Sequence, residues 1–102
     1  LRKLVRAVVQ PLRGSSRGHT DGVNYVAVSL EPPLVITASE DSTCLVWACH
    51  AGHWKTEQVL RGHRAGVSGV AVAQDAHVLA TSSFDATCRL WAQRRGGAWS
   101  CT

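Results

Sequence analysis

The 102-residue sequence contains no methionine, one tyrosine and one phenylalanine. Because position 1 is Leu1, we expect the chain to begin inside a longer protein or to have been processed. No apolar run approaches the roughly 18 residues that a membrane-spanning helix needs. No apolar core with a small-residue cleavage site follows the basic start, which excludes a secretory signal peptide.

Acidic residues are absent from residues 1–17, although this basic leader carries Arg2, Lys3, Arg6, Arg13 and Arg17. The whole chain has a formal net charge of +4, so the remainder is close to neutral. Leu4, Val5 and Val8 follow helical spacing, which is typical of a basic helix on an anionic membrane. The alternative is the outer strand and loop of a preceding repeat. We favour the strand, because a helix of about ten residues is marginal alone.

Four cysteines are too few for a disulfide scaffold of this length, so we expect an intracellular protein, with cytoplasm favoured over nucleus. Cys44, Cys49, His50 and His53 are possible zinc ligands that lie close together in the sequence. Their spacing matches no zinc finger, and the sequence has no second pair of cysteines that would complete a zinc site. We therefore predict no metal and no cofactor, and we interpret Cys44 and Cys88 as small core residues.

An internal repeat organises the chain. Residues 18–47 align without a gap on residues 62–91, at an offset of 44, and thirteen of the thirty positions are identical. Length alone suggests one small domain, but this repeat divides the chain differently. We expect one repeat at 18–61 and a second at 62–102, which is truncated in its last strand. Residues 1–17 would belong to a preceding unit.

Each repeat reads as a series of short strands separated by turn residues. The expected strands are 23–29, 34–38, 43–47 and 54–60 in the first repeat, then 67–73, 78–82, 87–91 and a last one beginning at Trp99. In both repeats the first strand has valines spaced three and then two apart, which is the slip that a β-bulge produces. Four antiparallel strands per period of 40–45 residues predict an all-β propeller with about two blades of an incomplete ring.

The segments GHTDGVNYVAV…VITASEDSTCLVW and GHRAGVSGVAV…LATSSFDATCRLW resemble repeats of the WD40 family from the opening Gly-His to the closing Trp. The Asp that follows this Trp in the family pattern is replaced by Ala48 and Ala92. The resemblance implies a β-propeller whose blades hold a hydrogen-bonded chain from Trp through Ser and His to Asp. The two expected networks are Trp47–Ser39–His19–Asp41 and Trp91–Ser83–His63–Asp85.

Each repeat contains a His, a Ser and an Asp, which are the residue types of a hydrolytic catalytic triad. An active site is needed once, however, whereas a structural device is needed in every blade. No Gly-x-Ser-x-Gly elbow surrounds Ser39 or Ser83. We therefore predict that the chain has no catalytic residues and is not an enzyme.

The resemblance places partner binding on the loops at one face of the propeller, beside the first valine of each blade and just before the network Asp. The positions are Gly22, Asn24, Glu40, Gly66, Ser68 and Phe84. Phe84 replaces Glu40 of the sister repeat, and exposed aromatic residues are favoured anchors at interfaces. The alternative is that Phe84 packs against a neighbouring blade.

These patterns predict a non-enzymatic protein–protein interaction scaffold, part of a WD40 β-propeller that assembles a multiprotein complex. The expected partners are other proteins, and no small-molecule substrate is expected. One alternative is an accessory propeller domain of a larger regulatory or enzymatic protein. Another is binding of an anionic membrane or nucleic acid through the basic leader, which we disfavour because the leader lacks stacking aromatic residues.

Overall fold

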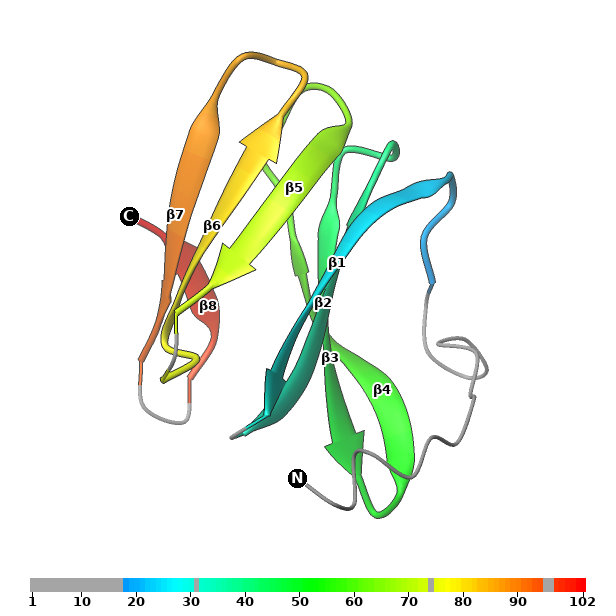
Figure 1. Ribbon diagram of the computed structural model, residues 1–102, viewed down its shortest axis with the longest axis vertical. Coiled ribbons are helices and arrows are strands. Elements are labelled where there is room, and N and C mark those ends of the chain that lie inside the picture. The colour runs from blue at the N-terminus through cyan, green and yellow to red at the C-terminus, as the bar shows by residue number, and fades with distance from the viewer. Residues whose placement is uncertain (1–17, 31, 74, 95–96) are drawn as a thin grey trace.

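A computed structural model of the chain describes residues 18–30, 32–73, 75–94 and 97–102. These residues form two four-stranded antiparallel sheets, ordered β1-β2-β3-β4 and β5-β6-β7-β8, and each sheet is one blade (Figure 1). The strands are β1 (Val23–Leu30), β2 (Pro33–Ser39), β3 (Cys44–His50), β4 (His53–Leu60), β5 (Val67–Val72), β6 (Val78–Ser83), β7 (Cys88–Gln93) and β8 (Trp99–Cys101). The all-β prediction is confirmed, and no helix long and apolar enough to cross a membrane is found among the described residues.

The strands follow from local sequence. Valine, isoleucine and leucine are frequent in the strands and suit a pleated backbone. Strands β2 and β3 are mostly apolar along consecutive residues, as in strands covered on both faces. The predicted bulge is present in both blades, where the register shifts between Val23 and Tyr25 and again between Val67 and Gly69. The β2–β3 and β6–β7 turns place Ser42 and Ala86 at φ of 74° and 69°, respectively. The two blades therefore repeat even the strained positions of their turns.

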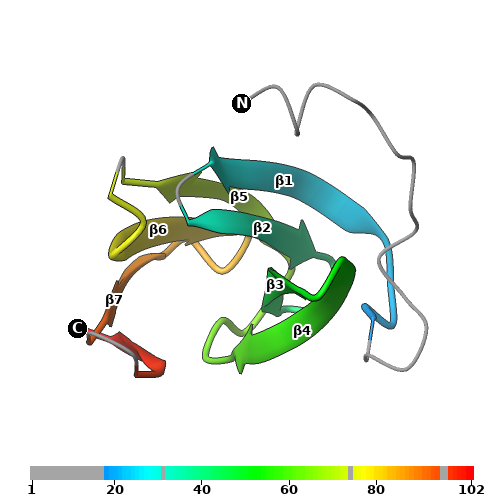
Figure 2. The same cartoon turned by 90° about the horizontal axis from the view of Figure 1, so that it is seen from below.

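The two sheets pack through one face of each. Alternate residues of β2 and β3 point from the first blade into a shared core, and β5 lies against β1 and β2 (Figure 2). The core residues are Leu34, Ile36, Ala38, Cys44, Val46, Ala48 and Leu60 from the first blade, and Val67, Val70, Ala76, Leu79, Trp91 and Trp99 from the second. Because each sheet buries its apolar face against the other, the loops at the strand ends are held in fixed positions.

Hydrogen bonds also join the two blades at their outer strands, β4 and β8. The Gln58 side chain on β4 donates from Nε2 to the Trp99 carbonyl at 2.7 Å, and its Oε1 accepts from the Trp99 N–H, also at 2.7 Å. The Gln58 side chain therefore makes two hydrogen bonds to the Trp99 backbone on β8, as a neighbouring strand would. The expected boundaries at 18–61 and 62–102 stay predictions, and the leader at 1–17 lies outside the described residues.

Candidate functional site

A chain of hydrogen bonds crosses the first blade on the side away from the core shared with the second. The Trp47 indole N–H donates to Thr37 Oγ1 at 2.9 Å, and His19 Nε2 lies 2.6 Å from the same oxygen. His19 Nδ1 lies 2.9 Å from Asp41 Oδ2. One proton arrangement satisfies every member: the Thr37 hydroxyl donates to Nε2, while Nδ1–H donates to the carboxylate.

The second blade repeats this arrangement. Trp91 Nε1 donates to Thr81 Oγ1 at 3.0 Å, His63 Nε2 lies 2.7 Å from that oxygen, and His63 Nδ1 lies 3.1 Å from Asp85 Oδ2. No buried side-chain nitrogen or oxygen lacks a hydrogen-bond partner within the described ranges. A fully satisfied polar network of this kind fixes one packing arrangement of the blade.

The hydroxyl in each network is a threonine, so the prediction of Ser39 and Ser83 at this position is wrong. Trp47 lies opposite Val35 in the β2–β3 register, and Thr37 is the next residue of β2 on the same face. Ser39 is two residues farther along the strand, about 7 Å away. Thr37 and Thr81 are identical between the repeats, but Ser39 and Ser83 are identical too, so only the strand register distinguishes the two positions.

Ser39 and Ser83 instead close the loops at the strand ends. Ser39 Oγ donates to the Gly22 carbonyl at 2.9 Å and accepts from the Asp41 N–H at 3.0 Å. Ser83 makes the same two bonds, to Gly66 and Asp85, at 2.9 and 3.1 Å. These serines therefore hold the loop before β1 or β5 against the turn that carries the network aspartate.

Hydrogen bonds keep both network aspartates ionised. Burial raises the pKa of Asp41, but bonds from the Thr43 hydroxyl, His19 and the Thr20 N–H outweigh it and lower this pKa to about 2. The Thr87 hydroxyl, followed by the Arg64 N–H, holds the pKa of Asp85 well below its usual range. Each carboxylate is thus a permanent acceptor for its histidine above about pH 4.

The same geometry does not suit hydrolysis. Thr37 Oγ1 already accepts from Trp47, and the Thr37 and Trp47 side chains are 6% and 1% exposed. A nucleophile must reach a substrate atom, and this hydroxyl faces only protein. The arrangement orients and stabilises the blade.

The predicted partner-binding positions form a second cluster, at the strand ends. We call Gly22, Asn24, Glu40, Gly66, Ser68 and Phe84 the loop face. Asn24 Nδ2 donates to Glu40 Oε1 at 2.8 Å and to the Val67 carbonyl of the next blade at 3.0 Å. A Cβ on Gly66 would lie 2.8 Å from Glu40 Oε2, so glycine leaves room for this carboxylate. Asn24 and Glu40 therefore join the two blades at this face.

The remaining loop-face residues differ in what they present to solvent. The Ser68 hydroxyl lies 3.0 Å from Ser82 Oγ and is directed at its own sheet. The Phe84 N–H donates to the Gly66 carbonyl at 2.9 Å, while its side chain is 67% exposed. Several large apolar residues are exposed among the described residues. Phe84 is the one that lies in a turn, and the others lie on strands.

The cysteines differ from one another in burial. Cys44 packs in the core, and burial raises the pKa of its thiol to about 12, which disfavours the thiolate that zinc requires. Cys88, at the equivalent position, is exposed, so its interpretation as a buried residue is wrong. The face of β7 that carries Cys88 is uncovered among the described residues. Within those residues, no three His, Cys, Asp or Glu side chains are grouped so that they could hold a metal ion.

Two paired sheets with one Trp–Thr–His–Asp network each define a β-propeller repeat protein. The family model described as "WD domain, G-beta repeat" matches residues 10–48 and 54–92, which together exceed half of the chain. The chain therefore belongs to the WD40 family, as its repeats predict. Each family match begins before the first strand of a blade, and the second match begins on β4 of the first blade.

A comparison with solved structures supports the same fold. The Saccharomyces cerevisiae protein Sqt1 superposes with a TM-score of 0.72 at 24% sequence identity, over 81% of this chain and 22% of Sqt1. This chain therefore spans about a fifth of that protein's length. No curated protein matches the sequence. WD40 propellers are generally non-enzymatic and typically bind other proteins.

Proposed function

We propose that this chain is part of a non-enzymatic WD40 scaffold that assembles a multiprotein complex, and that partner proteins dock on its loop face. The observation that carries the proposal is Phe84, a 67% exposed aromatic ring on a turn whose backbone is bonded to Gly66. An aromatic side chain has only two χ angles to fix on binding and buries a large apolar area, so on a hydrogen-bonded turn it suits an interface anchor.

The chemistry around Phe84 supports a protein partner. Glu40 places a carboxylate over Gly66, so an apolar ring and an acidic group flank the same backbone position. Residues 18–102 together are close to neutral, whereas surfaces that bind nucleic acid or anionic lipid carry a continuous basic face. We propose an intracellular location from the cysteine content, with cytoplasm favoured over nucleus.

Quantitative affinity capture tests the proposal, with the wild-type protein compared against Phe84→Ala and Leu90→Ala. Leu90 is the matched control, because it is an exposed apolar residue on strand β7 and outside the loop face. We expect partners that Phe84→Ala loses and Leu90→Ala retains. Their binding should depend weakly on salt. A set of partners that both variants retain would contradict the proposal.

A steep loss of binding as salt rises would point instead to an anionic ligand.

A further inference from the structure

The aspartates of this chain differ in the residue that follows them. The backbone nitrogen after an aspartate can attack the side-chain carbon Cγ and close a succinimide ring. This closure is easiest when the next residue is glycine, because glycine has no Cβ to hinder the approach of its nitrogen. Asp21 is followed by Gly22, whereas Asp41, Asp75 and Asp85 are followed by serine or alanine.

The backbone after these other three aspartates is also held by hydrogen bonds. In each case the N–H of the next residue donates to the carbonyl of a residue earlier in the chain. The bonds run from Ser42 to Ser39 at 3.2 Å, from Ala76 to Ala73 at 2.8 Å and from Ala86 to Ser83 at 3.2 Å. Closing a succinimide ring would break such a bond, because the nitrogen loses its proton.

At Asp21 the corresponding N–H is bonded to the aspartate itself. The Gly22 N–H donates to Asp21 Oδ1 at 2.8 Å. Because Oδ1 is bonded to Cγ, this hydrogen bond keeps the Gly22 nitrogen close to the carbon that it would attack. Reactions are favoured when the fold already holds the two atoms about 3–3.5 Å apart. The local geometry therefore favours ring closure at Asp21.

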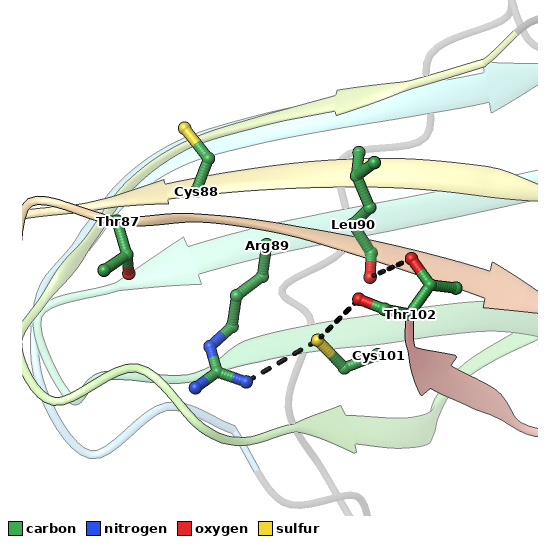
Figure 3. Close-up of a pocket in the computed structure, with 6 residues that line it drawn as sticks. All are labelled: Thr87, Cys88, Arg89, Leu90, Cys101 and Thr102. Atoms are coloured by element: carbon green, nitrogen blue, oxygen red, sulfur yellow. Dashed lines mark hydrogen bonds between the residues drawn. The ribbon is translucent and has the colours of Figure 1, made fainter.

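The carboxylates differ in the same sense. Asp85 Oδ1 accepts from the N–H of Thr87 at 2.9 Å and from its hydroxyl. Thr87 directly precedes β7 and lines the pocket of about 430 Å³ in Figure 3. Thr43 makes the same pair of bonds to Asp41. A carboxylate fixed by several donors cannot turn its carbon towards the next nitrogen. The Asp21 carboxylate, by contrast, is bonded within the described ranges to the Gly22 N–H alone.

Water reaches this position even where a neighbouring blade is present. Ala65 is the equivalent of Asp21 in the second blade, and it stays partly exposed although the first blade packs beside β5. Asp21 itself is exposed. Access for water matters because water must open the ring.

We propose that Asp21–Gly22 is a site of spontaneous modification, at which the peptide bond isomerises to an isoaspartyl linkage in the folded protein. The Gly22 nitrogen bonds to Cγ, and its proton leaves with the carboxyl O–H as one water molecule. A second water molecule then adds to the main-chain carbonyl carbon of Asp21. The bond from this carbon to the Gly22 nitrogen breaks, the nitrogen regains a proton, and the carbon becomes a carboxyl group. Addition at Cγ instead restores the original aspartate.

The isomer would alter the loop of the first blade and leave that of the second unchanged. The new linkage adds one methylene group to the main chain between Asp21 and Gly22. The Gly22 carbonyl accepts from Ser39 Oγ and from the Glu40 N–H, both at 2.9 Å. A longer main chain displaces this carbonyl, so both bonds weaken. The loop of the second blade makes equivalent bonds, but Ala65 has no carboxyl group that could react.

Incubation of the folded protein at neutral pH and body temperature tests the proposal. Methylation by an isoaspartate methyltransferase marks the linkage by mass, and peptide mapping locates it. We expect the mark to accumulate at Asp21 and to stay at background at Asp41, Asp75 and Asp85. Asp21→Ala, which copies the second blade, should abolish it. Gly22→Ala should slow it several-fold, and a Cβ there would meet no atom of the described residues within 4 Å.

Amide hydrogen exchange on fresh and incubated samples measures the effect on the loop. The Glu40 N–H should exchange faster in the isomerised protein, because its acceptor is displaced. The Phe84 N–H is the matched control, since it donates to the Gly66 carbonyl at the same distance of 2.9 Å. Its protection should be unchanged, which also shows that the second blade is still folded.

A background signal at Asp21 in the folded protein, or an equal signal at the other three aspartates, would overturn the proposed site. Unchanged exchange of the Glu40 N–H in the isomerised protein would overturn its effect on the loop. Neither measurement uses a binding partner, so both outcomes are independent of the docking proposed for the loop face.

Discussion

The threonine at the centre of each network gives a sharp test of the blade architecture. Thr37→Val keeps the volume of the side chain and removes the hydroxyl. It leaves the Trp47 N–H without an acceptor and His19 Nε2 without a donor, and the indole is 1% exposed, so water cannot reach it. Each buried group left unsatisfied costs roughly 1–3 kcal/mol. Two such groups predict a loss of about 2–6 kcal/mol of the free energy of unfolding.

Thr37→Ser is the matched control, because it keeps the hydroxyl and removes only a methyl group. A buried methyl group contributes roughly 1 kcal/mol, so this variant should be less destabilised than Thr37→Val. Urea unfolding followed by tryptophan fluorescence, at one fixed protein concentration, measures both losses. The equivalent pair at Thr81 should behave alike, because Thr81 is 1% exposed and accepts from Trp91 in the same way.

A second readout separates Thr37 from Ser39. The NMR resonance of the Trp47 indole N–H should shift and exchange faster in Thr37→Val, but should stay unchanged in Ser39→Ala, because Ser39 bonds only backbone groups. The network we describe is refuted if Thr37→Val is no less stable than Thr37→Ser, or if Ser39→Ala alone moves the indole resonance.

Two further predictions concern the Gln58–Trp99 hydrogen bonds between the blades and the dependence of stability on pH. Gln58→Ala should cost about 1–2 kcal/mol in urea unfolding, because two half-buried hydrogen bonds to Trp99 are lost; Gln93→Ala, which loses one exposed bond to Gly97, should cost less. Equal losses of the free energy of unfolding in the two variants would contradict a stabilising role of the Gln58–Trp99 hydrogen bonds. The folded pKa of Asp41, about 2, lies below its ordinary value of 3.8, so its contribution is present above about pH 4 and is lost as pH falls towards 2. Asp41→Asn should therefore reduce the slope of stability against pH in this window, and an unchanged slope would show that the carboxylate contributes nothing there.

Local pattern predicts most of this fold because the repeat supplies each strand twice. The apolar periodicity indicates all eight strands, and the valine spacing predicts the bulges at Val23 and Val67 before any long-range contact is known. Both features depend on neighbours within one strand or one turn, which is the range over which sequence pattern is informative. The offset of 44 residues then identifies the unit that must stack.

Contacts that join distant residues were not predictable in this way. Gln58 is 41 residues from Trp99, and nothing in its own strand distinguishes it from any exposed glutamine. The Ser39 prediction failed because residue type and repetition cannot tell Thr37 from Ser39, which lie on one face of one strand. Only the strand register decides which hydroxyl the Trp47 indole reaches.

Burial is the property that the repeat itself cannot predict. Val23 and Val67 are the same residue at the same position of the repeat, and the bulge next to each is the same, yet one is half-exposed and the other fully buried. Sequence specifies the shape of each blade, whereas exposure depends on which neighbour covers it. Identical repeats therefore differ in exposure according to which neighbouring sheet packs on them. The same reasoning explains why Cys44 is a core residue while Cys88 is exposed.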